Sequence, residues 1–226
     1  MAKGTDEAVR AAFFRVEGAL VRAPSLRSAA WFTMNAQELG GRVSRLGGVA
    51  LATGLKLAGG LGEQQLVQRA AWMGLRSMSA DRIAFLGEEY YERFVAPNAL
   101  EVGRELVDEA RRQGHRIVLL SENIRAVVAP LQALFKADDL ICNSLELRSE
   151  RATGRLTDPV IGGALSGNWA RHWATEHAVD LNASSAYGTT SADSMLLNVI
   201  GRPCAVNPDR RLRRIAKDLD WPVVER

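Results

Sequence analysis

The feature that most constrains this chain is an apolar stretch near its start that carries two charged residues. Residues 11–21 run AAFFRVEGALV, so Arg15 and Glu17 follow four apolar side chains and Gly18 comes next. A short apolar run ending at a glycine is typical of a buried strand and a tight turn. Side chains alternate between strand faces, so the two charges are predicted to point the same way. Open α/β sheets bind ligands at the carboxyl ends of their strands, and we expect both charges to face such a site.

The chain after this strand predicts a block of helices followed by an α/β pattern. Pro24 breaks the chain, Ser25 is expected to cap the first helix, and no strand signal interrupts residues 25–91. Helices are predicted over 25–39, 42–57, 63–73 and 79–94. From Pro97 onward, strands over 115–121, 139–144, 184–188 and 204–207 alternate with helices, the last of which starts at Pro208. A hairpin is predicted within 146–160, with its turn at 153–155.

This order predicts an α/β fold with a Rossmann-like core, a mostly parallel sheet and helices on both faces. The core is expected to comprise residues 1–23 and 98–226, and the all-helical insertion residues 24–97. A chain of 226 residues is long enough for one such domain with an insertion. The most apolar window, residues 43–61, contains Arg45 and Lys56, so we expect no membrane span.

Charge and cysteine content narrow the class of partner. The net charge is only +3, and no aromatic residues interleave with the basic run at 210–214. We interpret that run as a solvated helix face and expect no nucleic-acid partner. Cys142 and Cys204 have no metal-ligand spacing and are expected to be reduced core thiols. With no signal peptide recognised at the start, we expect a cytoplasmic protein. We also expect no metal or cofactor. The expected partner is a small molecule or a protein, and homo-oligomer formation stays open.

The order of elements and several phrases resemble the haloacid dehalogenase (HAD) superfamily, subfamily IB, the phosphoserine-phosphatase-like branch. Residues 187–193 (YGTTSAD) and 205–209 (AVNPD) closely follow the ending of that branch. The helical insertion lies where the branch carries its helical cap. The resemblance covers nearly the whole chain and implies a capped HAD core.

The resemblance also implies a chemistry that this sequence departs from. The family forms an aspartyl-phosphate on the first Asp of an Asp-x-Asp-Gly-Thr motif, with Mg²⁺ bound and the second Asp as acid and base. Arg15 stands at the nucleophile's position, Glu17 at the second Asp, and Ala19 at the Thr. A guanidinium has no lone pair with which to attack phosphorus, so family-type covalent catalysis is expected to be lost.

The other family motifs are altered too. Ser121 fits the hydroxyl of the second motif, although a helix N-cap would also explain it. Asn168 stands where the phosphate-binding Lys is expected, Thr189 where a metal-binding Asp is expected, and Asp193 remains. We expect Arg15 to take the place of Mg²⁺ and to pair with Glu17 or Asp193, which would weaken Mg²⁺ binding. The candidate ligand contacts are Arg15, Ser121, Asn123, Asn168, Thr189 and Thr190.

Three functions stay open on these residues. The first is a pseudo-phosphatase that has lost phosphoryl transfer and acts by binding a ligand or a protein. The second is a metal-independent enzyme that uses Glu17, Asp193 or Ser121 for acid-base chemistry, such as an elimination, isomerisation or cyclisation. The third is residual metal-dependent phosphatase activity.

Overall fold

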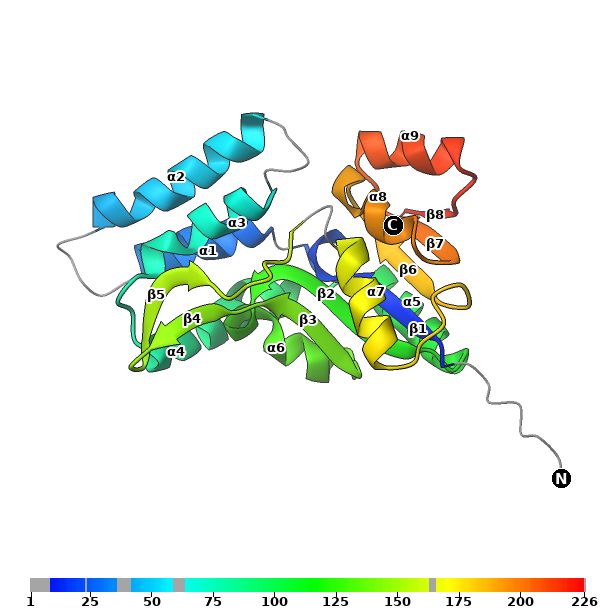
Figure 1. Cartoon of the computed structure of the whole chain (residues 1–226), viewed down its shortest axis with the longest axis horizontal. Coiled ribbons are helices and arrows are strands. Elements are labelled where there is room, and N and C mark those ends of the chain that lie inside the picture. Colours follow the sequence, from blue (N-terminus) through cyan, green and yellow to red (C-terminus); the bar gives the residue numbers. More distant parts are fainter. Residues whose placement is uncertain (1–8, 23, 36–41, 59–63, 163–165, 226) are drawn as a thin grey trace, which may run out of the picture.

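A six-stranded parallel sheet forms the centre of the protein, in the order β3-β2-β1-β6-β7-β8. The computed structural model describes residues 9–22, 24–35, 42–58, 64–162 and 166–225. The strands of this sheet are β1 Ala11–Arg15, β2 Arg116–Ile124, β3 Asp139–Asn143, β6 Ser185–Gly188, β7 Arg202–Val206 and β8 Val223–Val224. The predicted α/β class with a mostly parallel sheet is therefore confirmed (Figure 1).

The strand β1 lies in the interior of this sheet and ends at Arg15, so Glu17 was wrongly expected within the strand and lies in the turn that follows it. Every residue of β1 is buried, as expected for a strand that helices cover on both faces. Its last residue, Arg15, is in register with Leu120 of β2, and Phe14 is in register with Tyr187 of β6. The carboxyl ends of β1, β2 and β6 therefore meet at one edge of the sheet.

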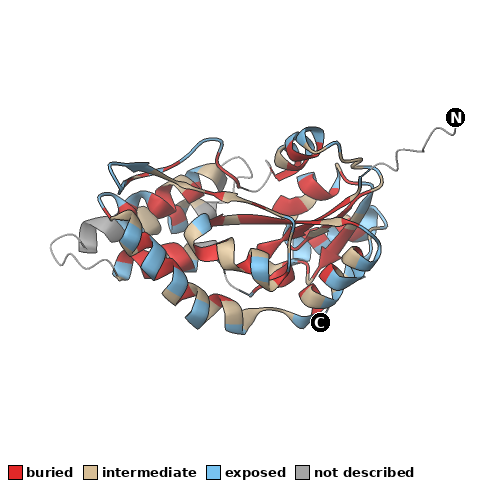
Figure 2. Ribbon diagram, turned by 90° about the horizontal axis from the view of Figure 1, so that it is seen from below, coloured by how far each residue is buried: buried red, intermediate tan, exposed pale blue. Residues whose placement is uncertain are grey.

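Helices cover both faces of the sheet, and alternate residues of β1 show which helix covers which face. Phe14 packs in one cluster with Val107 of α5 (Glu101–Arg112) and Leu131 of α6 (Arg125–Leu134). Phe13 packs in another with Trp173 and Leu212. These two residues belong to α7 (Ser166–Glu176) and α9 (Arg210–Asp218), and the short α8 (Ser194–Leu197) joins the same face. Figure 2 shows the buried strands between these layers.

The described elements of the insertion are all helical, and Ser79 between them forms an isolated bridge with Arg151 of the hairpin. These elements are α1 Ser25–Met34, α2 Arg42–Ala58, α3 Gln64–Trp72, the 3₁₀ turn η4 Met73–Leu75, α4 Ala80–Tyr90, the π-helical turn η5 Tyr91–Val95 and the 3₁₀ turn η6 Ala96–Asn98. Trp31, Phe32, Trp72 and Tyr90 form an aromatic group within it, and this group belongs to the same buried cluster as Phe14. The boundaries at 23/24 and 97/98 stay a prediction. The end of the helix predicted over 25–39 falls at residues 36–39, which lie outside the described residues.

The hairpin after β3 differs from its prediction. Its strands are β4 Leu145–Arg148 and β5 Arg151–Leu156, so the turn lies at Ser149 and Glu150, both with positive φ, and not at 153–155. Gly154 is inside β5 at φ +83°, where a Cβ atom would lie 2.9 Å from the carbonyl oxygen of Met73. This glycine thus allows close packing of β5 on η4 and does not form the turn.

Two smaller features complete the fold. The two-residue strand β8 was not predicted, since so short a segment carries no alternation. The terminal helix starts at Arg210 instead of Pro208, and the Asp209 side chain accepts a hydrogen bond from the Leu212 amide as its N-cap. Within the described ranges, no helix combines the length and the apolar character that crossing a bilayer requires.

Candidate functional site

A tight turn positions the charges that end β1. The chain turns within Val16–Leu20, where the Gly18 amide donates to the carbonyl of Val21 at 2.8 Å and the Val21 amide donates to that of Val16 at 2.9 Å. Gly18 has φ +94°, a left-handed conformation that favours glycine. A Cβ atom there would lie 2.9 Å from Oγ1 of Thr189, so the absence of a side chain lets the turn pack against the loop after β6.

Arg15 lies at the centre of three carboxylates. Its side chain is only 5% exposed, and its Nε is 2.9 Å from Oδ1 of Asp193. Its Nη2 is 3.1 Å from Oε1 of Glu122 and 3.6 Å from Oε2 of Glu17. Burial lowers the pKa of Arg15, but the three carboxylates together raise it above its ordinary value. Both acids expected beside Arg15 are therefore in place, and Glu122 is an addition that the sequence analysis missed.

The pKa of the Glu17 carboxyl lies above the ordinary value of a glutamate. Burial raises its pKa, and the charge of Glu122 raises it further, whereas Arg15 and the hydrogen bond from Ser121 lower it. Burial and the neighbouring charge of Glu122 thus both disfavour the charged form of Glu17, and the single guanidinium of Arg15 offsets this only in part. The side chains of Glu17 and Glu122 remain 14% and 18% exposed, so both keep some contact with solvent.

The end of β2 supplies hydrogen bonds to this cluster. Ser121 donates its hydroxyl proton to Glu17 Oε1, and its Oγ accepts from the Asn123 amide at 3.0 Å. The amide of Glu122 lies 3.4 Å from Oε2 of Glu17. The residue that precedes α6 is Ile124, so the alternative role of Ser121 as the N-cap of that helix is wrong. Its hydroxyl instead holds the Glu17 carboxyl by a hydrogen bond.

The loop after β6 holds Asp193 in place. Oδ2 of Asp193 accepts hydrogen bonds from the amides of Thr189 and Thr190 at 2.8 and 2.9 Å, which leaves Oδ1 facing Arg15. The Thr189 hydroxyl donates to the carbonyl of Glu17 at 3.0 Å, so this loop also fixes the β1 turn. Asn168, in contrast, is exposed on α7, and its side-chain oxygen lies 3.4 Å from Nη1 of Arg171.

The helical insertion contributes two contacts that sequence reasoning did not anticipate. Ser28 of α1 donates to Oδ1 of Asn123 at 2.8 Å. Gln68 of α3 donates to Oε2 of Glu122 at 3.0 Å. The candidate ligand contact Asn123 is therefore buried and joins the insertion to the sheet edge. The position of Glu122, next to Ser121 at a strand end, was the available signal for including it.

The residues of this site do not fit the Mg²⁺ that the family implies. Mg²⁺ requires oxygen ligands around a vacant centre, whereas here a guanidinium lies between the carboxylates. Across the described part of the chain, no group of three or more His, Cys, Asp or Glu side chains is arranged to hold a metal ion.

Comparison with known proteins decides the family. Residues 12–197 match the haloacid dehalogenase-like hydrolases. The chain belongs to this family. The "Inhibition of morphological differentiation protein" of Streptomyces azureus is 26% identical over 171 residues, which are 75% of this chain and 62% of that protein. Phosphoserine phosphatase SerB1 of Mycobacterium tuberculosis is 26% identical over 159 residues, 69% of this chain and 51% of the relative. The chain thus spans between 51% and 62% of the length of these two relatives.

Solved structures show the same fold over nearly the whole chain. A Bordetella pertussis protein of unknown function superposes with a TM-score of 0.82 at 23% identity, covering 96% of this chain and 98% of that one. A phospho-aspartyl intermediate analogue of a phosphoserine phosphatase superposes with a TM-score of 0.70 at 13% identity, covering 97% and 94%. The expected phosphoserine-phosphatase-like HAD fold is confirmed.

Proposed function

We propose that this chain is a HAD-family pseudo-phosphatase that acts in the cytoplasm by binding a small molecule or a protein. The observation that carries this proposal is the Arg15 cluster at the end of β1. An arginine stands where the family resemblance implies the nucleophilic Asp, and three carboxylates hold it there. A protonated guanidinium offers no lone pair to a phosphoryl group. The side chain at this position therefore cannot accept the phosphoryl group that an Asp would accept.

The electrostatics of the cluster also oppose metal-dependent catalysis. A buried guanidinium repels a divalent cation, and its three carboxylate partners are engaged with it. The oxygen of Thr189, where the resemblance implies a metal-binding Asp, donates its proton to the Glu17 carbonyl. The residues at the family's metal-binding positions therefore pair with Arg15 or hold the turn after β1, and do not leave oxygen ligands free for Mg²⁺.

Hydrolysis of an aryl phosphate tests the loss of phosphatase activity. We expect the wild-type protein with Mg²⁺ to show no turnover above the Glu17→Gln variant, because neither has a nucleophile. A catalytically intact HAD phosphatase in the same assay is the sensitivity control. Mg²⁺-dependent hydrolysis by the wild type that disappears in Glu17→Gln would overturn the proposal.

A second candidate function rests on the protonation of Glu17. Burial raises the pKa of this partly exposed carboxylate, as is common for acid-base catalysts, and Ser121 orients it. A metal-independent elimination, isomerisation or cyclisation would use Glu17 as the proton donor or acceptor. A thermal-shift screen of phosphates, carboxylates and prenyl or acyl compounds supplies ligands for the test. A ligand that the wild type converts, and that Glu17→Gln binds without conversion, would favour this function over pure binding.

A further inference from the structure

An arginine-lined pocket lies away from the Arg15 cluster, between the hairpin β4–β5 and the turn η4 of the helical insertion. Its volume is about 340 Å³, which is within the range of small-molecule sites. Eight residues line it: Arg76, Ser77, Glu146, Arg148, Arg151, Ala152, Thr153 and Arg155. Four arginines thus contribute to the lining of the cavity, whereas a single lining residue carries a carboxylate.

The walls of this pocket are fixed by backbone contacts between the insertion and the hairpin. The Ser77 amide donates to the carbonyl of Ala152, and the Ala152 amide donates to that of Met78, both at 2.8 Å. Gly154 permits β5 to approach Met73 closely, as described above. The site is therefore built from two segments that are far apart in the sequence and are held in register with one another.

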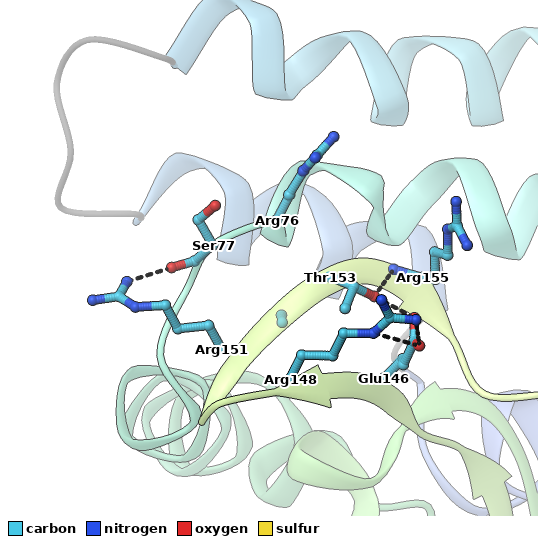
Figure 3. Close-up of a pocket in the computed structure, with 8 residues that line it drawn as sticks. Arg76, Ser77, Glu146, Arg148, Arg151, Thr153 and Arg155 are labelled. Carbon is cyan, nitrogen blue, oxygen red and sulfur yellow. Dashed lines mark hydrogen bonds and ion pairs between the residues drawn. The ribbon is translucent and has the colours of Figure 1, made fainter.

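The arginines divide into a pair that is held by the protein and a pair that is available. Arg151 donates to the carbonyl of Ser77 at 2.7 Å, and Arg148 donates to Oε1 of Glu146 at 3.0 Å. Arg76 and Arg155 are exposed, and their guanidiniums make no hydrogen bond or ion pair within the described residues. Figure 3 shows Arg151 and Ser77 on one side, Arg148, Glu146 and Arg155 on the other, and Arg76 above the hairpin, with the side chains of Arg76 and Arg155 pointing away from the pair of Arg148 and Glu146.

We propose that this pocket binds a small ligand that carries a diphosphate group. Guanidinium groups bind phosphate oxygens through paired, charge-assisted hydrogen bonds, and several of them at one site favour a ligand with more than one anionic group. A diphosphate carries about three negative charges at neutral pH, which matches the excess of arginine over glutamate in the lining. The group can come from inorganic diphosphate or from a nucleoside diphosphate, and the test below separates the two.

Calorimetric titration with inorganic pyrophosphate and with ADP tests the proposal, in buffer of constant ionic strength without divalent cations. The variant Arg76→Ala/Arg155→Ala removes the two available guanidiniums without breaking a described contact, and we expect at least tenfold weaker binding of both probes. The control Arg210→Ala/Arg211→Ala removes the same charge from exposed positions of α9, and we expect less than a twofold change. ADP binding more tightly than pyrophosphate identifies a nucleotide as the source, and equal or tighter pyrophosphate binding identifies the free diphosphate.

Weaker binding by the alanine variant could also result from damage to the fold. A variant that is expected to bind more tightly separates the two explanations. In Glu146→Gln the side-chain oxygen still accepts the hydrogen bond that Thr153 donates at 2.6 Å, while the charge that competes for Arg148 is removed. We expect pyrophosphate to bind about two- to fivefold more tightly to this variant. Absence of binding to the wild type at millimolar pyrophosphate and ADP overturns the proposal. So does equal weakening in the α9 control, or a preference for an oligonucleotide over both diphosphates.

Discussion

Arg15 is a buried cation whose burial depends on its carboxylate partners. Replacing it with alanine leaves Glu17, Glu122 and Asp193 close together without a countercharge. Removal of one partner from a buried ion pair costs about 3–5 kcal/mol, so we expect Arg15→Ala to lower the free energy of unfolding by about that amount in urea denaturation. The control is Arg93→Ala, which breaks the exposed pair with Glu89 and should cost less than about 0.5 kcal/mol. An equal loss in the free energy of unfolding for the two variants would show that Arg15 is not a buried cation held by its carboxylate partners.

The raised pKa of Glu17 predicts a pH dependence of stability. The folded protein binds a proton at Glu17 more tightly than the unfolded chain, chiefly because the carboxyl is buried. The contribution of this group is therefore complete below its unfolded pKa and is lost as the pH rises through its folded pKa. We expect the free energy of unfolding of the wild type, relative to that of Glu17→Gln, to fall as the pH increases above about 4.5, the ordinary pKa of Glu.

The control for this measurement is an exposed glutamate whose pKa shifts in the opposite direction. The hydrogen bond from Arg112 lowers the pKa of Glu109, so its contribution is already complete above the ordinary value. The difference between the wild type and Glu109→Gln should therefore stay constant above pH 4.5. A constant difference for Glu17→Gln as well would show that Glu17 ionises like a solvated acid.

Individual site residues could be predicted from the sequence where a family position carries an unusual residue. Arg15 replaced an expected acid, so its need for carboxylate partners followed from the cost of burying a charge. Glu122 was missed because its one signal, the position directly after Ser121 in β2, does not show whether its side chain faces Arg15 or solvent. Its place against Arg15 depends on the register of β2 with β1 and on Gln68 of a distant helix, which only the folded chain brings together.

The contact between α1 and the end of β2 is the element-scale feature most open to a test. Ser28 and Asn123 are both buried, so Ser28→Ala removes a buried hydrogen bond and leaves Oδ1 of Asn123 with the Ile124 amide, 3.1 Å away, as a donor. We expect Ser28→Ala to lower the free energy of unfolding by about 1–2 kcal/mol and to speed amide hydrogen exchange in α1 more than in the sheet. Thr33→Val on the same helix is the control, because the Thr33 hydroxyl donates to the carbonyl of Ala29 within α1 and so does not join the helix to the sheet. Equal exchange in the two variants would count against a link between helix and sheet.

The elements themselves followed well from periodicity where they were long and regular. The interior strands and α5 and α6 were expected because apolar runs and 3.6-residue patterns alternate there. The hairpin turn was misplaced because Thr153-Gly154-Arg155 has turn composition, while the actual turn uses Ser149 and Glu150 in left-handed conformations. Composition predicts a glycine's freedom but not whether a turn or close packing uses it, and here the contact with Met73 decides.

The insertion and the sheet also behave as a connected whole. The buried cluster that contains Phe14 continues through Trp31 and Trp72, so the hydrophobic core does not stop at the predicted boundary of the insertion. The site draws on both parts, since Gln68 and Ser28 of the insertion bind Glu122 and Asn123 at the sheet edge. Sequence periodicity identifies each part separately, but it contains no information about contacts made between them.

Replacing Arg15 with aspartate tests whether the guanidinium keeps Mg²⁺ out of the site. The change removes the guanidinium and adds a carboxylate to Glu17, Glu122 and Asp193, so a divalent cation becomes the available neutralising charge. We expect 10 mM Mg²⁺ to raise the Tm of Arg15→Asp by about 3–5 °C and to leave that of the wild type unchanged. Phosphatase turnover should remain absent, because Asn168 is exposed on α7 and Thr189 supplies no carboxylate.

The variant Arg15→Asn separates the two parts of that change, since it removes the cation without adding a carboxylate. We expect its Mg²⁺-dependent rise in Tm to be smaller than that of Arg15→Asp, because fewer oxygen ligands carry charge. A Tm shift of the wild type equal to that of Arg15→Asp would show that the guanidinium does not exclude the metal. Covalent labelling of Arg15→Asp by a phosphate donor would show that Asn168 and Thr189 do not prevent phosphoryl transfer. The absence of the nucleophilic Asp alone would then account for the lack of phosphatase activity in the wild type.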